Sequence, residues 1–222
     1  MKKVILLLSL LAFLFPCASS THALDLVFDY NYTYTGTAPS GSAPWLRTTF
    51  EYMGSSYQGN KIVRITFEAL NLKPDEFVTD WYFNLNPNID LTKLKSSYVY
   101  GPAATFSFGA DQFKAPGDGK FDMKVSFPTA NKDRFGYNGE ARYQIESPDP
   151  NFGISSFNFL STPDTGDRKS FLSAAHVQGI ATGEGSGHVS PGEGISPVPE
   201  PGTMLLLGLG LIGIALVMRE ML

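Results

Sequence analysis

The sequence predicts an all-β protein: a single antiparallel β-sandwich with jelly-roll-like connections, between an N-terminal signal helix and a C-terminal hydrophobic helix. Apolar and polar residues alternate with a period of two through several short segments, as in strands with one buried face. Aromatic residues make up 13% of the chain and charged residues only 17%, with 22 Gly and 15 Pro residues to form turns. Many short strands with aromatic faces bury those faces best by stacking two sheets.

The N-terminus has the three parts of a signal peptide in order. Lys2 and Lys3 precede an apolar run over residues 4–15, and a short stretch of small and polar residues follows. The apolar run is shorter than the ~20 residues that a membrane-spanning helix needs, which disfavours an uncleaved anchor. We therefore predict that residues 1–23 are a signal peptide cleaved after Ala23.

The predicted β domain covers residues 24–190 and contains eight or nine strands. The clearest alternation lies over residues 24–35, 62–69, 77–85, 121–127 and 141–146. Aromatic pairs mark shorter candidate strands at Phe50 and Tyr52, Phe106 and Phe108, and Phe157 and Phe159. Residues 116–119, Pro-Gly-Asp-Gly, predict a turn, because Pro fixes φ and Gly permits positive φ.

Charge and cysteine content exclude several functions. The 222 residues contain 17 Lys and Arg against 21 Asp and Glu. Because Lys2 and Lys3 lie in the leader, the remainder has 15 basic and 21 acidic residues, a net charge of −6 that argues against nucleic acid as a partner. The only cysteine, Cys17, also lies in the leader, so the β domain is expected to hold no disulfide and no thiolate metal site.

The C-terminus combines a linker with an apolar segment. Residues 191–202 form a linker that is rich in Pro and Gly, and residues 203–222 form a hydrophobic sorting or anchor helix. Its apolar core, residues 204–218, would cover about 22 Å as a helix, against a hydrocarbon core of ~30 Å. The segment is therefore a marginal membrane span.

The residues before this segment resemble a known sorting signal. This end of the chain resembles the PEP-CTERM signal, which consists of a Pro-Glu-Pro triplet (here Pro199, Glu200 and Pro201), a short hydrophobic helix and a charged terminus. The same tail also carries the label of an ice-binding protein C-terminal domain. The resemblance implies that an exosortase, a membrane processing enzyme of bacteria that make extracellular polysaccharide, recognises the triplet. The family usually ends in an arginine cluster, whereas this chain has Arg219 followed by Glu220. A plain membrane anchor therefore remains an alternative.

The middle of the chain also resembles an ectodomain found on PEP-CTERM proteins. This resemblance implies an architecture and a location but no activity. The matching stretches are residues 43–46, 80–87, 117–122, 155–160 and 174–180.

Acidic residues near the Gly-rich turn are weak candidates for a metal site. Asp111, Asp118 and Asp122 could offer oxygen ligands to Ca²⁺, but carboxylates at turns also bind their own backbone. Their spacing differs from the Asp-x-Asp-x-Asp-Gly calcium loop, so we expect no metal. The same interpretation applies to Asp164 and Asp167.

No catalytic motif stands out. His176 and His188 lie in no two-histidine metal spacing, and the chain has no Gly-x-Ser-x-Gly elbow. A glycoside hydrolase would need two facing carboxylates, and Glu68, Asp80 and Glu146 are not singled out as a pair. We expect no enzyme activity and no cofactor.

We predict an exported protein of the cell envelope or matrix, with a structural or interaction role linked to exopolysaccharide or biofilm. It would be anchored in the membrane through the C-terminal helix and then reach the cell surface or the medium. One alternative is a carbohydrate-binding module or adhesin, which requires a solvent-facing aromatic row; a second is a secreted hydrolase, which requires a cleft with paired carboxylates. The aromatic candidates are Tyr30, Tyr32, Tyr34, Trp45, Tyr98 and Tyr100.

Overall fold

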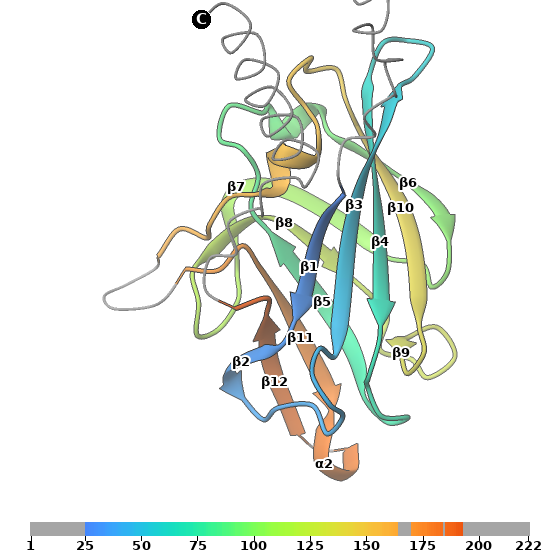
Figure 1. The fold of residues 1–222 in the computed structure, drawn as a ribbon, viewed down its shortest axis with the longest axis vertical. Coiled ribbons are helices and arrows are strands. Elements are labelled where there is room, and N and C mark those ends of the chain that lie inside the picture. The colour runs from blue at the N-terminus through green and yellow to red at the C-terminus, as the bar shows by residue number, and fades with distance from the viewer. Residues whose placement is uncertain (1–24, 164–169, 184, 193–222) are drawn as a thin grey trace, which may run out of the picture.

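The fold is a sandwich of two antiparallel sheets, which confirms the predicted all-β class (Figure 1). The computed structural model describes residues 25–163, 170–183 and 185–192. The predicted signal helix and C-terminal helix lie outside these residues. Helical structure within them is confined to three short turns, η1 (Leu91–Lys93), η2 (Ile154–Phe157) and α2 (Ile180–Gly183).

The first sheet, sheet A, has five strands. They run in the spatial order β1 (Leu26–Tyr30), β3 (Leu46–Ser55), β4 (Lys61–Ala69), β10 (Glu140–Ser147) and β6 (Lys95–Tyr100). All neighbours in this sheet are antiparallel. Alternate residues face the core, so the predicted period of two over residues 62–69 and 141–146 appears here as β4 and β10.

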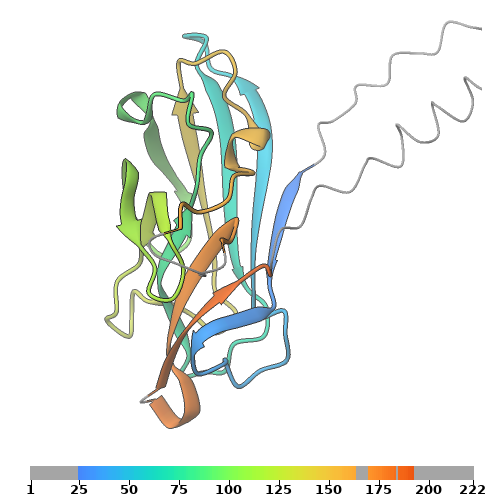
Figure 2. The same ribbon diagram turned by 90° about the vertical axis from the view of Figure 1, so that its left-hand side faces the viewer.

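The second sheet, sheet B, has seven strands and brings the two ends of the domain together. Its order is β2 (Tyr32–Gly36), β12 (Gly185–Ser190), β11 (Ser173–Gly179), β5 (Phe77–Phe83), β8 (Lys120–Ser126) and β7 (Thr105–Lys114), with β9 (Phe135–Gly136) pairing with β5. Figure 2 shows the orange strands β11 and β12 beside the blue β2. Completing sheet B therefore needs strands from both the first and the last parts of the domain.

The connections interleave the two sheets. The hairpins β3–β4, β7–β8 and β11–β12 each stay within one sheet, whereas the connections from β1 to β2, β4 to β5, β5 to β6 and β6 to β7 cross between sheets. Such crossings are a feature of jelly-roll-like sandwiches. They place the ends of strands from both sheets at the two rims of the sandwich, where loops gather.

Aromatic side chains fill the space between the sheets. The Phe50 ring stacks on Phe157 with ring centroids 4.5 Å apart and meets Phe83 edge-on at 5.5 Å. Phe67 packs against Trp81 across the two sheets at 4.8 Å. All five rings are fully buried, and burying one side chain of this size contributes about 1.5–3 kcal/mol.

A buried polar chain joins the two sheets beside this core. Ser173 on β11 donates its single hydroxyl hydrogen to the carbonyl of Tyr82 at 2.8 Å. The Tyr30 hydroxyl on β1 must then donate to Ser173 Oγ, 2.6 Å away, and accept from Thr48 Oγ1 at 3.3 Å. Burial raises the pKa of Tyr30 above its ordinary value, so the hydroxyl stays neutral in this chain.

Tyr30→Phe is expected to lower the free energy of unfolding by about 1–2 kcal/mol, because it leaves two buried hydroxyls with one partner fewer. Urea unfolding followed by tryptophan fluorescence measures this change. Tyr57→Phe is the matched control, since Tyr57 is fully exposed in the β3–β4 turn. Equal stability of the two variants would contradict the role of the Tyr30 hydroxyl.

Two predicted strands differ from the structure. Residues 24–35, predicted as one strand, form β1 and β2 in different sheets, and the chain crosses between the sheets at Asn31. β1 buries Phe28 and Tyr30, whereas β2 is only partly buried over residues 33–35. Phe157 and Phe159 were predicted in a strand, but Phe157 ends η2, since its buried ring reaches the core from a helical turn.

The described residues form twelve strands rather than eight or nine. The predicted turn at residues 116–119 is confirmed, with the Asp118 N–H donating to the Ala115 carbonyl at 3.1 Å and Gly117 at φ +94°. The segment near residues 90–95 is the turn η1, capped by the Asp90 carboxylate.

Candidate functional site

Of the three aspartates that the sequence grouped together, the structure brings Asp111 and Asp122 into contact and places Asp118 elsewhere. The pairing of β7 with β8 shifts between Phe108 and Phe113, so that β7 bulges opposite Asp122. Asp111 lies in this bulge with a positive φ of 52°, and its N–H donates to Asp122 Oδ1 at 2.8 Å. Asp122 Oδ2 accepts from the Leu85 N–H at 3.0 Å. The bulge thus brings Asp111 to Asp122, as bulges re-aim side chains near binding sites.

Asp118 is buried apart from this pair. Its Oδ1 accepts from the Gly119 N–H at 2.6 Å and from Ser161 Oγ at 2.7 Å. Its Oδ2 and the Tyr34 hydroxyl are both buried without a hydrogen-bond partner among the described residues. Burial raises the pKa of Asp118 to about 6. Asp118 therefore serves the turn and is not a freely available ligand.

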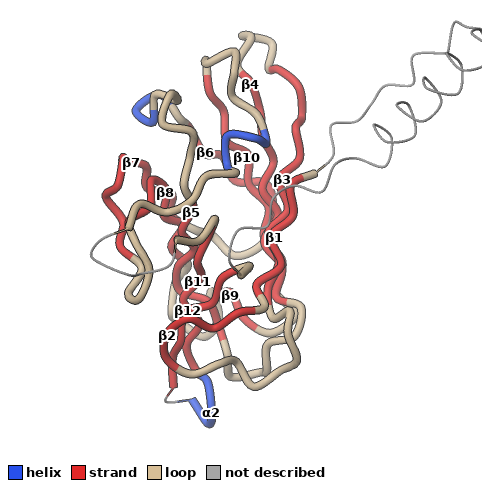
Figure 3. The backbone as a smooth tube through the Cα atoms, turned by 60° about the vertical axis from the view of Figure 1, so that its left-hand side comes forward, coloured by secondary structure: helices blue, strands red, loops and turns tan. Residues whose placement is uncertain are grey.

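A pocket with a volume of about 280 Å³ opens beside Asp111 and Asp122. Its walls come from the segment after β5, from β7 and β8, and from the segment after η2; β5, β8 and β7 lie side by side in Figure 3. Asn84, Phe159 and Leu160 also line it. Sequence patterns alone did not reveal this pocket, although the Asn-Leu-Asn-Pro run at residues 84–87 was a signal for a loop leaving a strand.

His176 and His188 form a stacked pair on adjacent strands of sheet B. Their rings are 4.4 Å apart and nearly parallel, at 8°. His176 Nδ1 is hydrogen-bonded to Thr79 Oγ1 at 2.9 Å. Burial lowers the pKa of His176, and burial together with His176 lowers the pKa of His188 to about 4, although Asp80 acts in the opposite direction. The pair is therefore neutral at pH 7.

The carboxylates considered for hydrolysis do not face one another. Asp80 lies on β5 in sheet B, where it accepts from Ser126 Oγ at 2.6 Å. Glu68 and Glu146 lie on β4 and β10 in sheet A. Glu68 pairs in register with Glu140, six residues before Glu146, which separates the two carboxylates along the strand by about 20 Å.

The aromatic candidates divide between core and surface. Tyr30 and Trp45 are buried, whereas Tyr98 and Tyr100 on the edge strand β6 are 61% and 52% exposed. The Arg142 guanidinium lies 6.0 Å from the centre of the Tyr100 ring. These exposed tyrosines are two residues apart, but Tyr98 also meets Tyr143 edge-on at 5.8 Å.

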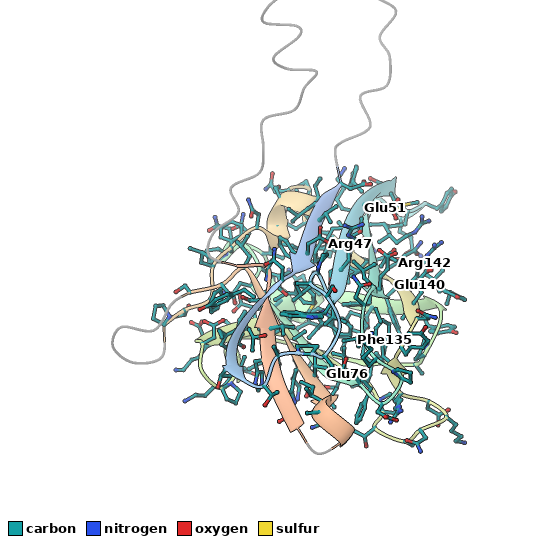
Figure 4. The ribbon with its side chains drawn as sticks, turned by 60° about the horizontal axis from the view of Figure 1, so that its bottom comes forward. Arg47, Glu51, Glu76, Phe135, Glu140 and Arg142 are labelled. Carbon is teal, nitrogen blue, oxygen red and sulfur yellow. The ribbon has the colours of Figure 1, made fainter. Side chains whose placement is uncertain are left out.

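Charged side chains of sheet A pair with one another on its strands. Arg47 donates two hydrogen bonds to Asp29, and Arg142 is 2.7 Å from Glu140; Figure 4 labels Arg47, Glu140 and Arg142. Exposed pairs of this kind contribute at most about 1 kcal/mol each.

The buried Glu76, also labelled in Figure 4, is a structural anchor. Its carboxylate accepts from the N–H groups of Ser40 and Lys73, both at 2.7 Å. It ties the loop before β3 to the loop before β5.

Residues 25–163, 170–183 and 185–192 contain neither a metal-binding cluster nor a membrane-spanning helix. No group of three or more His, Cys, Asp or Glu side chains in these ranges could hold a metal ion. No helix in the same ranges has the length and apolar character to cross a membrane. The predicted cleavage site at Ala23, the triplet Pro199, Glu200 and Pro201, and Asp164 and Asp167 lie outside the described residues.

Comparison with known families places this chain among exported proteins. Residues 197–219 match the PEP-CTERM protein-sorting motif, a range that includes Pro199, Glu200 and Pro201. The chain thus carries a PEP-CTERM sorting motif, which supports export toward the cell surface and sorting by an exosortase; the match gives no support to the ice-binding label. Comparisons with curated proteins and with solved structures gave no match.

Proposed function

We propose that the protein is a non-catalytic component of the cell envelope or extracellular matrix that associates with exopolysaccharide. The observation that carries this proposal is the sorting motif at residues 197–219, because exosortase systems occur in bacteria that make such polymers. The C-terminal helix holds the protein at the membrane until the enzyme processes it. The β domain then acts outside the cell as the part that meets the polymer.

The placement of the carboxylates supports a non-catalytic role. A glycosidase holds its two carboxyl groups about 5–9.5 Å apart across one cleft. Glu68 and Glu146 are about 20 Å apart along sheet A, and Asp80 belongs to the other sheet with the aromatic core between them. Burial lowers the pKa of His176 and of His188, and the neighbouring His176 lowers that of His188 further, so packing within sheet B accounts for both shifts.

Deleting the host's exosortase gene is expected to change both the mass and the location of the protein. In the parent strain, the intact mass should lack the leader and the residues beyond the 199–201 triplet, and the protein should be recovered with purified exopolysaccharide. In the deletion strain, residues 203–222 should remain and the protein should stay with membranes. A strain that makes no exopolysaccharide is the control for recovery with the polymer.

Each readout tests one half of the proposal. An identical mass with residues 203–222 retained in both strains would mean that the tail is an ordinary anchor. Release of the processed protein into the medium, free of polymer in the parent strain, would remove the proposed association with exopolysaccharide.

A further inference from the structure

We propose that the pocket beside Asp111 and Asp122 binds a single neutral sugar unit of a polysaccharide. This inference rests on the proposed function, since it names the part of the β domain that would contact the polymer. The pocket volume of about 280 Å³ lies just below the range for small-molecule sites, about 300–1,000 Å³. This size suits one sugar ring rather than a longer chain.

The polar groups of the pocket are set to accept hydrogen bonds from hydroxyls. Asp122 is held by two backbone N–H groups, those of Leu85 and Asp111, and each carboxylate oxygen keeps a further lone pair. The Asp111 carboxylate makes no hydrogen bond or ion pair within the described residues. The site is thus preorganised by one fixed carboxylate and completed by a second that is available.

Asn84 is an independent sign that a ligand belongs here. Its side chain is buried, with the residue only 3% exposed, and it lines the pocket. Its Oδ1 is buried with no hydrogen-bond partner among the described residues, and folded proteins rarely leave such an atom unpaired. This oxygen is shielded from solvent in the structure, and a sugar hydroxyl that displaced its cover would supply the missing donor.

The rest of the lining selects among ligands. Seven of the twelve lining residues are apolar, among them Phe159 and Leu160, and a sugar ring presents apolar C–H faces that pack against such side chains. A Ca²⁺ ion would instead need six to eight oxygen ligands. The described lining has two carboxylates and no Lys, Arg or His, so it disfavours sugar acids and favours neutral rings.

The test measures how tightly the processed protein, with leader and tail removed, binds neutral oligosaccharides of two to six units. Mild acid releases these oligosaccharides from the host exopolysaccharide. Asp111→Gly and Leu160→Ser should each weaken binding at least tenfold. Both positions are exposed, and glycine accepts the positive φ at residue 111, so both variants should fold. Asp111→Asn, which keeps an acceptor and tolerates positive φ, should bind within threefold of the wild type.

Tyr57→Ala and Tyr100→Ala are the matched surface controls, and both should bind as the wild type does. If Asp111→Gly and Leu160→Ser bind as the wild type does while Tyr100→Ala does not bind, the pocket is not the sugar site. That result would overturn this inference and keep the proposed function. No binding of the wild type to any fragment or to the intact polymer would defeat both proposals. Ca²⁺ binding to the protein alone, lost in Asp111→Gly and without sugar binding, would show a cation site instead.

Discussion

Asp118→Asn is expected to raise the free energy of unfolding at pH 7 by about 2–3 kcal/mol, since a pKa difference of one between the folded and unfolded states is worth about 1.4 kcal/mol. Asp118 has a native pKa of about 6 against an ordinary value of 3.8. The native state therefore holds this proton more tightly than the unfolded state does. In the wild type, the stability that the protonated Asp118 contributes is fully present below pH 3.8 and is lost as the pH rises through 6.

The asparagine side chain fits the contacts of Asp118. Its Oδ1 can still accept from the Gly119 N–H and from Ser161 Oγ, while its Nδ2 replaces the unpaired Oδ2. An amide carries no charge to bury, so the cost at neutral pH disappears. Asp118→Ala, which removes both accepted hydrogen bonds, should destabilise the protein by about 1–3 kcal/mol instead.

Urea unfolding at pH 4, 5, 6 and 7 separates the charge from the packing. The gain from Asp118→Asn should vanish near pH 4, where the wild-type carboxyl is protonated. Asp75→Asn is the control, because Asp75 is an exposed carboxylate on the loop before β5. A loss of stability at pH 7 in Asp118→Asn would show that the ionised carboxylate stabilises the turn.

The sequence was sufficient for the fold class but not for the strand pairing. Alternation over residues 62–69 and 141–146 requires one buried face and so predicts β4 and β10 directly. It cannot show that residues 24–35 pass from one sheet to the other, because both halves keep the same period. The edge strand β6 is exposed along its whole length, so it has no apolar face for a pattern to reveal.

The candidate site was predicted only in part for a related reason. Asp111, Asp118 and Asp122 are close in sequence, and only the bulge in β7 decides that Asp111 meets Asp122. A bulge is a property of the register between two strands, which composition does not encode. Asn84 and Phe159 reach the pocket from loops that follow distant elements, so no local motif joins them to the aspartates.

His188→Phe is expected to protect the protein against acid by about 2–3 kcal/mol at pH 4, the free energy that corresponds to the lowered pKa of His188 after allowance for partial solvent screening. The native pKa of His188 is about 4, against an ordinary 6.5. The unfolded state therefore takes up the proton first. In the wild type, the stability that the neutral His188 contributes is fully present above pH 6.5 and is lost as the pH falls through 4.

The variant keeps the contacts of the imidazole ring while removing its proton site. Phenylalanine can stack on His176 and pack against Tyr34, as His188 does at 4.4 and 5.9 Å between ring centroids. NMR can follow the protonation of the imidazoles in the wild type and in the variant. Only His176 and His188 remain after cleavage at Ala23, so the variant assigns both imidazole signals. Titration of both near 6.5 would contradict the prediction.

Asp118 and His188 act in opposite directions over the same interval. As the pH falls from 6 to 4, the wild type gains stability because Asp118 takes up a proton in the native state. Over the same interval it loses stability because His188 is protonated more readily in the unfolded state. A shallow pH profile of the wild type would therefore hide two large contributions. Asp118→Asn should leave a profile that falls on acidification and His188→Phe one that rises, so the two slopes, compared with the wild type, identify each group.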